Sequence, residues 1–459
     1  MKRHIPLFIS VLFLGGALLV LSGCGESDPV SYEVSLEVWG TFDDSDAFNQ
    51  VVNEYTKLNP YVKSIKYRKI APETYKDDLL NAMASGNGPD IFMLRNTWLS
   101  GFADKAIPAP ATFLTEKRLR DAFVDVVADD FLNADKQVMA VPLSVDSLAL
   151  YYNKDIFNAA GITAPPKTWE ELVAMIPLLV RQDEFGNLNQ TAIALGAGEN
   201  VNRSSDILLN LMQQYGASIT EPHFGDQPNR QALEFYTQFA RLGLPTYTWN
   251  QRQHYSIDAF YEGTLGMMIN YSYHYPTIRQ KNAKLNFAVA PLPQFKDRPP
   301  VNFANYWGFA VTKNKAQVVD PSRPQQALST ENYQLARVHE AWQFLSYLTL
   351  PHPSGALTLT NAFSGTTADF PLPLDPAKKY IELTKKPAAR RDLIDTQKGD
   401  VVLSPFVNGN LIAKSWKPGN TEQTEGLLVD AISTVGRGER NIAEALSILD
   451  ARYTQLNRR

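Results

Sequence analysis

The sequence predicts an α/β protein built from two lobes, and three observations support this fold class. About 435 of the 459 residues follow Cys24, which is more than one compact core usually holds. Apolar and polar residues alternate over Val34–Trp39 and again over Val62–Ile70, as in strands with one buried face. Ile91–Leu94 is fully apolar, which is typical of a buried parallel strand.

The helices are predicted from apolar residues that recur at a period of 3.6. Within Phe48–Leu58 five such residues form one face, and Asn59-Pro60 ends the helix. Thr168 and Glu171 form a capping box at the start of another helix. The same periodicities predict helices over Glu73–Met83, Lys154–Ala160, 168–180, Ser205–Tyr215, Asn229–Leu242 and Gln334–Leu350, two helices within Thr421–Leu456, and strands over Leu265–Ile269 and Tyr306–Thr312.

Two long extended segments have the length and pattern of connections between lobes. They are Ala140–Asn153 and Phe287–Pro293. Because they lie far apart in the sequence, each lobe is expected to be assembled from separate stretches of chain. The residues 270–275, Asn-Tyr-Ser-Tyr-His-Tyr, are expected to form a polar and aromatic loop after the preceding strand.

The N-terminal segment predicts a location outside the cytoplasm. Lys2 and Arg3 precede the apolar run Ile5–Leu21, as in a secretory signal peptide. The run ends in Leu-Ser-Gly-Cys, which resembles the lipobox of bacterial lipoproteins, and Cys24 is the only cysteine of the chain. The alternative is an uncleaved membrane anchor, for which 17 apolar residues are at the short limit. A diacylated Cys24, palmitate being a typical acyl chain, would hold the body to the membrane through the polar stretch Glu26–Pro29.

Composition excludes several classes of protein. Charged residues make up 20% of the chain and the net charge is −4, without a basic block, which argues against a nucleic-acid partner. A single cysteine permits no intramolecular disulfide. The six histidines are scattered and show no zinc-binding spacing, so neither a metal nor another cofactor is expected.

A set of short segments resembles family 1 extracellular solute-binding proteins of ABC importers, the group that includes the maltose-binding protein. The resemblance runs over about residues 34 to 455, and the order and spacing of the segments carry it. They are Glu37–Gly40, Ala84–Ile91, Val141–Leu143, Tyr151–Asp155, Pro166–Leu172, Phe260–Gly263 and Gly266–Ile269.

The resemblance implies a two-lobed, class II-like periplasmic-binding-protein fold that closes on a ligand at the hinge and performs no catalysis. Each lobe would hold a mostly parallel sheet flanked by helices. The implied organisation is a lipoprotein signal peptide (1–23), a tether (24–33), a first lobe (34–142 and 293–350) and a second lobe (146–288 and 353–459), with crossings near 143–145, 289–292 and 351–352. The implied partners are a small solute, most simply a sugar or oligosaccharide, the membrane subunits of an ABC permease, and the membrane itself through Cys24. The protein is expected to be a monomer.

The family's ligand sites map onto loops of this chain. The segment where many members have Gly-Gly reads Asn-Tyr-Trp-Gly at 305–308, a departure that places bulky aromatic rings there. The implied ligand-binding residues are Trp39, Thr41, Asp43, Asp44, Asn96, Thr97, Trp98, Asp146, Tyr271, Tyr273, Asn305, Tyr306 and Trp307.

The chemistry of these residues fits a sugar or similar polyol. Sugars present C–H faces that stack on aromatic rings and hydroxyls that need polar partners. Structural roles remain open for some residues, because Trp39 at a strand end could belong to the core and Asp43 or Asp44 could cap the first helix. Aromatic walls are expected from Trp98, Tyr273 and Trp307, and polar partners from Asp43, Asp146 and Asn305.

Other functions are less well supported by the residues. A lipid-anchored glycosidase needs two carboxylates on either side of the scissile bond, whereas Asp43, Asp44 and Asp46 share one short loop. Tyr151-Tyr152 suggests ferric iron, yet strand alternation points the two rings to opposite faces. A receptor for a polyamine or a peptide is excluded by neither charge nor composition.

Overall fold

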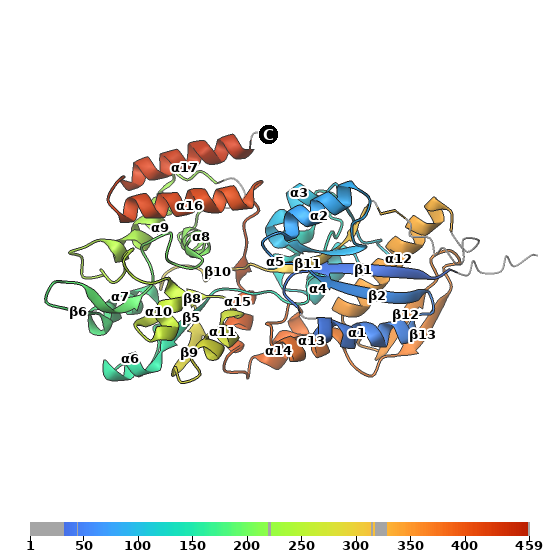
Figure 1. Ribbon diagram of the computed structural model, residues 1–459, viewed down its shortest axis with the longest axis horizontal. Helices are drawn as coiled ribbons and strands as arrows, with labels where there is room; N and C mark the ends of the chain where they lie inside the picture. Colours follow the sequence, from blue (N-terminus) through green and yellow to red (C-terminus); the bar gives the residue numbers. More distant parts are fainter. Residues whose placement is uncertain (1–31, 44, 219–221, 314, 317–327, 458–459) are drawn as a thin grey trace, which may run out of the picture.

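Two lobes lie side by side along the long axis of the molecule (Figure 1). The structure, a computed structural model, describes residues 32–43, 45–218, 222–313, 315–316 and 328–457. The signal peptide, Cys24 and most of the predicted tether lie outside the described residues, as does Asp44. Each lobe contains a five-stranded sheet with helices packed on it, which confirms the predicted two-lobed α/β fold.

The sheet of the first lobe has the strand order β2-β1-β3-β11-β4. β1 pairs in parallel with both β2 and β3, and β11 returns from more than 200 residues later to pair antiparallel with β3. The apolar face predicted for the first helix is buried, with Phe48, Val51 and Tyr55 fully enclosed. The elements of this lobe are β1 (Val34–Gly40), α1 (Ser45–Leu58), β2 (Val62–Lys69), α2 (Tyr75–Ala84), β3 (Ile91–Arg95), η1 (Asn96–Trp98), α3 (Leu99–Phe102), β4 (Ala106–Ile107), α4 (Glu116–Ala122), α5 (Asp125–Phe131), β11 (Trp307–Thr312), α12 (Thr330–Thr349), β12 (Ala356–Thr360), β13 (Thr367–Pro371), α13 (Pro376–Thr384) and α14 (Arg391–Gln397).

The sheet of the second lobe has the order β6-β7-β8-β5-β9. Only β7 and β8 pair in parallel there, so the expectation of a mostly parallel sheet is wrong for this lobe. The predicted capping box begins α7, where the Thr168 hydroxyl accepts the Glu171 amide at 3.2 Å and the Glu171 carboxylate accepts the Lys167 amide at 2.7 Å. The predicted loop 270–275 is shorter than expected, because α11 already begins at His274. The elements are β5 (Ala149–Asn153), α6 (Lys154–Ala159), α7 (Trp169–Leu179), β6 (Arg181–Gln182), β7 (Leu188–Ile193), α8 (Ser204–Gln214), α9 (Gln227–Thr237), η2 (Gln238–Ala240), α10 (Ser256–Glu262), β8 (Leu265–Asn270), α11 (His274–Lys281), β9 (Phe287–Pro291), α16 (Thr421–Gly436) and α17 (Ile442–Asn457).

The buried side chains form two hydrophobic cores that correct the expected lobe boundaries. Residues 357–394 contribute to the first core, although 353–459 was expected in the second lobe. The reason is that β12 and α13 follow α12 and pack on it, that α13 also packs on α1, and that β13 pairs with β12. Phe303 lies in the second core, so the stretch 293–303 does not belong to the first lobe as a whole. Tyr32 is also buried in the first core, so the folded body begins before the predicted end of the tether at residue 33.

Among the described residues three segments connect the lobes, and one of them matches a predicted crossing. In the first, Ser144 bridges to Ala388 and Ser147 to Ala304. The second was expected near 289–292, but β9 there belongs to the sheet of the second lobe, and the crossing lies at β10 (Asn302–Phe303), which pairs in parallel with β14 (Ala413–Lys414). The third crossing was expected near 351–352, but it runs through α15 (Ser404–Asn410) and β14 instead.

Short polar contacts fasten α15 to the first crossing. The Asn410 amide donates to the Val145 carbonyl at 2.6 Å, and the Ser147 hydroxyl donates to the Phe406 carbonyl at 3.0 Å. Gly409 passes so close to Ser147 and Asn302 that an added Cβ would lie 2.5 Å from each of these side chains. The connecting segments therefore form one closely packed hinge. Among the described residues, no helix is both long enough and apolar enough to cross a bilayer.

Candidate functional site

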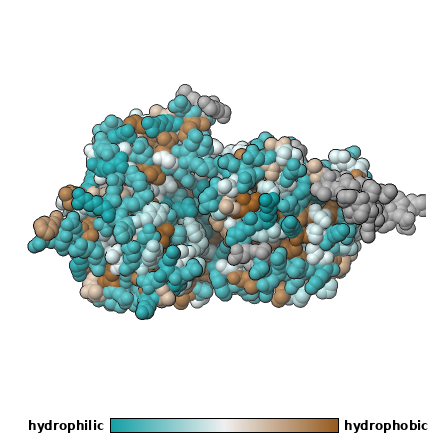
Figure 2. Space-filling view, in the orientation of Figure 1, coloured by the Kyte–Doolittle hydropathy of each residue, from teal (hydrophilic) through white to brown (hydrophobic). Residues whose placement is uncertain are grey.

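A cavity of about 880 Å³ lies between the two lobes beside the hinge. The surface is hollowed along the line where the lobes meet (Figure 2). The first lobe contributes the loop after β1, the start of β11 and the end of α13, and the second lobe contributes the start of α8 and α11. The residues that carry most of its chemistry are Phe42, Asp146, Arg203, Ser272, Tyr273, Tyr275, Arg279, Asn305, Tyr306, Trp307, Tyr380 and Lys386.

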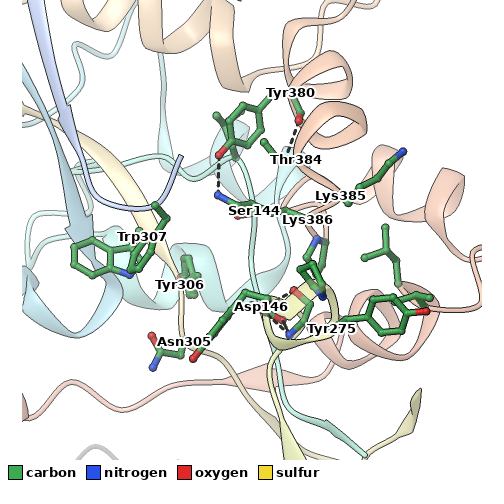
Figure 3. A pocket seen from close by; sticks show the side chains of 18 of the residues that line it. Ser144, Asp146, Tyr275, Asn305, Tyr306, Trp307, Tyr380, Thr384, Lys385 and Lys386 are labelled. Atoms are coloured by element: carbon green, nitrogen blue, oxygen red, sulfur yellow. Dashed lines mark hydrogen bonds between the residues drawn. The ribbon is translucent and has the colours of Figure 1, made fainter. Parts of the chain in front are cut away.

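The wall from the first lobe is aromatic. Trp307 begins β11 and is half-buried, and its ring meets Trp98 edge-on at 5.0 Å and Phe42 at 5.5 Å. Tyr306 is held more deeply, because its hydroxyl donates to Asp130 at 2.8 Å. In the close-up, Trp307 and Tyr380 lie on either side of the open space (Figure 3). Such rings offer flat apolar surfaces on which the C–H face of a sugar can stack.

The wall from the second lobe combines tyrosines with a guanidinium group. Tyr273 is 45% exposed, and its hydroxyl accepts hydrogen bonds from Nη2 and Nε of Arg203 at 2.7 and 3.2 Å. Tyr271 lies behind it, fully buried, and donates to Asp206 at 2.8 Å. Tyr271 therefore supports the wall, whereas Tyr273 forms its surface.

Asp146 lies at the centre, on the first crossing (Figure 3). Its carboxylate accepts hydrogen bonds from the Ser272 amide at 3.0 Å and from the Ser272 hydroxyl at 2.7 Å. Burial raises the pKa of Asp146 to about 7, against the hydrogen bonds from Ser272 and the positive charge of Lys386, which lower it. The side chain can thus exchange a proton near neutral pH.

Asp43 does not line the cavity but holds two residues that do. It is 4% exposed, and its carboxylate accepts hydrogen bonds from the Tyr380 hydroxyl and the Lys386 ammonium group. Tyr380 and Lys386 come from α13 and the turn after it, more than 330 residues further along the chain. Asp43 was expected to contact the ligand, but in the structure its carboxylate binds Tyr380 and Lys386 instead.

Besides Asp43 and Tyr271, five further expected site residues lie outside the cavity lining. Trp39 donates from its indole nitrogen to Glu37 at 2.8 Å and packs beneath Arg68. Asn96 donates to Asp130 at 3.0 Å inside the first lobe. The remaining three are Thr41, which is buried, and Thr97 and Trp98, which lie against α16 of the second lobe.

The residues that the structure brings into the cavity from the expected set are Asp146, Tyr273, Asn305, Tyr306 and Trp307. Sequence reasoning missed Arg203, Tyr380 and Lys386. Phe42 could have been found, because it directly precedes Asp43 in the loop already singled out. Arg203 carried no local signal, since its unusual backbone angle is visible only in three dimensions.

The described residues contain no cluster of three or more metal-ligating side chains. The two adjacent tyrosines considered for iron diverge as expected from strand alternation. Tyr151 is fully buried and donates to the Tyr271 carbonyl at 2.7 Å, and Tyr152 packs on Phe157.

Solved structures share this architecture over almost the whole chain. A cyclo/maltodextrin-binding protein complexed with maltotetraose superposes with a TM-score of 0.68 at 14% identity, covering 95% of this chain and 99% of that one. A cyclic α-maltosyl-1,6-maltose-binding protein from Arthrobacter globiformis gives 0.70 at 19% identity, covering 92% and 98%. At such identities the likeness establishes the fold alone.

Curated relatives are similar at the level of sequence over part of their length. A maltotriose-binding protein of Pyrococcus abyssi is 25% identical over 250 residues, which are 54% of this chain and 50% of that protein. The sn-glycerol-3-phosphate-binding periplasmic protein UgpB of Yersinia pseudotuberculosis is 25% identical over 274 residues, 55% of this chain and 57% of that protein. The chain thus spans about half the length of these curated relatives.

The family is shown by a match that covers most of the chain. The sequence model described as bacterial extracellular solute-binding protein matches residues 39–352. This stretch includes the loop after β1, the first two crossings and the start of β11, all of which border the cavity. The predicted family is thereby confirmed: the chain belongs to the bacterial extracellular solute-binding proteins, which bind solutes.

Proposed function

We propose that the protein is the substrate-binding lipoprotein of an ABC importer and that it captures a saccharide in the cavity between its lobes. One observation carries the proposal. The cavity has the size of a small-molecule site, and its walls are aromatic side chains from both lobes with a few polar groups between them. Relatives named for maltotriose and maltodextrins support the choice of a saccharide.

Within this proposal, the aromatic rings and the central polar groups have separate tasks. Trp307 and Tyr273 supply stacking surfaces from opposite lobes, so a bound sugar would contact both. Asp146 and Asn305 supply hydrogen-bonding groups for its hydroxyls. The proposed contacts are thus Asp146, Tyr273, Asn305, Tyr306 and Trp307, with Phe42, Arg203, Tyr380 and Lys386 added by the structure.

Hinge closure would couple binding to transport. Within the described part of the chain, three segments that pack together connect the lobes, and a ligand that contacts both lobes favours the arrangement in which they approach each other. In this closed arrangement, surfaces of both lobes would face the permease together. A diacylated Cys24 would keep the receptor at the outer face of the membrane and raise its effective concentration near that permease.

Thermal unfolding with a solute panel tests the binding function. A ligand that binds only the folded protein raises the unfolding midpoint. The panel contains mono- and oligosaccharides, sugar acids, polyamines and dipeptides. We expect a saccharide, neutral or charged, to raise the midpoint and to decrease the radius of gyration measured by X-ray scattering. A midpoint shift only with a polyamine or a dipeptide would contradict the saccharide, and no shift with any compound would contradict the proposal as a whole.

A further inference from the structure

The charges around the cavity are unbalanced in favour of positive groups. Arg203 and Arg279 approach it from the second lobe and Lys386 from the first. Only Lys386 forms an ion pair, with Asp43, whereas neither arginine has a carboxylate within 4.0 Å among the described residues. Lys385 also borders the cavity but extends away from the other labelled side chains (Figure 3).

The acidic groups of the lining are engaged by the protein itself. Asp400 accepts the backbone amides of Val402 and Leu403 at 2.8 and 3.0 Å, which caps the start of the following turn. Asp146 accepts hydrogen bonds from Ser272, and burial raises the pKa of Asp146 to about 7. At neutral pH this carboxyl therefore carries only part of a negative charge, so the positive side chains of the lining outnumber its charged acidic ones. Asp206, which does not line the cavity, also acts on Arg203.

Arg203 is held in an unusual backbone conformation at the edge of this cavity. It precedes α8 with φ at 61°, in the left-handed region that is unfavourable for a residue with a side chain. Such strain persists only where the surrounding structure enforces it, and it is often found at ligand sites.

The guanidinium group of Arg203 is oriented but not saturated. Nε and Nη2 both donate to the Tyr273 hydroxyl, and the group lies 5.6 Å from the centre of the Tyr271 ring. Nη1 has no hydrogen-bond partner among the described residues. Arg279 is similarly fixed, since it donates to the Leu285 carbonyl at 2.9 Å and lies 4.4 Å over the Phe287 ring. Both guanidinium groups are thus held in place, and each keeps N–H groups that could donate to a ligand.

We propose that the solute carries an anionic group, a carboxylate or a phosphate, which Arg203 binds while the sugar portion stacks on Trp307. This inference rests on the proposed saccharide-binding function and narrows the solute to an acidic saccharide or a sugar phosphate. Hydrogen bonds between a guanidinium group and an oxyanion are about twice as strong as neutral ones, and few other groups recognise two oxygens at once. The same positive charges repel a polyamine.

Matched pairs of probes measured by calorimetry test this inference. Glucuronate and glucose 1-phosphate are each compared with glucose, and trigalacturonate is compared with maltotriose. We expect the charged member of at least one pair to bind about ten-fold more tightly, with a preference that weakens as salt is added. Equal or tighter binding of every neutral member would overturn the inference and leave the receptor function intact. If neither member of any pair binds, the saccharide-binding function fails as well.

A variant of Arg203 locates the preference. Arg203→Gln should reduce the preference for the charged probe about ten-fold and change the affinity for the neutral probe little. Arg298→Gln is the matched control, because Arg298 also lies over a tyrosine, Tyr215, but outside the cavity. Arg279→Gln serves as a second variant if Arg203→Gln does not fold, as judged by circular dichroism. A preference that survives both cavity variants would overturn the assignment.

Discussion

Arg95 and Glu425 form an ion pair of 2.8 Å that joins the first lobe to the second. Arg95 ends β3, and Glu425 lies on α16. One turn earlier on the same helix, Glu422 accepts hydrogen bonds from Lys76 at 2.8 Å and from the indole of Trp98 at 3.1 Å. These contacts exist only while α16 lies against the first lobe, so they stabilise this arrangement of the lobes relative to any arrangement that separates them.

Breaking this pair should shift the equilibrium between lobe arrangements. A partly buried ion pair contributes about 1 kcal/mol, so Glu425→Gln should change that equilibrium about five-fold. X-ray scattering of the solute-free protein should then show an altered radius of gyration, and the double variant Arg95→Glu with Glu425→Arg should restore it. Lys117→Gln is the control, because it breaks an exposed pair with Asp121 inside one helix. Scattering identical to that of the natural protein would contradict the prediction.

Two neighbouring tryptophans should differ in what their removal changes. Trp307 is half-buried at the cavity, so Trp307→Ala should weaken solute binding by about 1–2 kcal/mol, or roughly ten-fold, with a smaller effect on stability. Trp98 is 9% exposed and stacks on Phe102, so Trp98→Ala should lower the free energy of unfolding by about 3 kcal/mol. Calorimetric affinities and urea unfolding separate the two effects. Trp307→Phe, which keeps a ring, should retain most of the affinity, and a larger loss of stability in Trp307→Ala than in Trp98→Ala would refute this division.

The regular elements could be predicted from the sequence because their causes are local. Alternation over β1 and β2 and the apolar face of α1 reflect which side of each element is buried. The site could be predicted only in part, because its partners are distant. Asn96 and Trp98 follow a buried strand in the way ligand residues do, yet Trp98 meets α16, which lies more than 320 residues away.

The same limit explains the residues that were missed. Tyr380 and Lys386 come from a stretch that was expected in the second lobe, and their partner Asp43 is more than 330 residues earlier. No local pattern distinguishes a helix that borders a cavity from one that covers a sheet. The third crossing was placed wrongly for a related reason, since nothing in the end of α12 reveals that β12 and β13 remain on the same lobe.

The raised pKa of Asp146 predicts a stability that falls as the pH rises. The folded pKa of about 7 exceeds the ordinary value of 3.8, so folding takes up a proton between these values and stability decreases over that interval. Asp146→Asn removes this dependence. Its free energy of unfolding, relative to that of the natural protein, should therefore rise steadily from about pH 4 to pH 7 and stay constant above. The total gain should be about 1–2 kcal/mol once water access to this half-buried group is allowed for. A gain for Asp146→Asn that is equal at pH 4 and pH 8 would contradict the shift.

The lipid anchor can be tested apart from solute binding. Cys24→Ser removes the only thiol to which acyl chains could be attached, so the full chain expressed in a bacterial host should no longer incorporate labelled palmitate. Its distribution between membrane and supernatant fractions should change accordingly. Ser27→Ala, three residues further on, is the matched control and should remain at the membrane. Labelled palmitate in the Cys24→Ser protein would refute acylation at this residue.

Asp43 should control the positive charge available in the cavity. Its carboxylate neutralises Lys386 and accepts a hydrogen bond from Tyr380, so Asp43→Asn keeps the side chain's size while releasing one positive charge beside the cavity. We expect a charged probe such as glucuronate to bind a few-fold more tightly, with glucose unaffected, and the free energy of unfolding to fall by about 1–3 kcal/mol because a buried hydrogen-bonded ion pair is lost. Lys386→Gln removes the positive charge instead and should weaken the binding of the charged probe. If both variants changed the affinities for glucuronate and glucose by the same factor, Asp43 and Lys386 would act on the shape of the cavity and not on its charge.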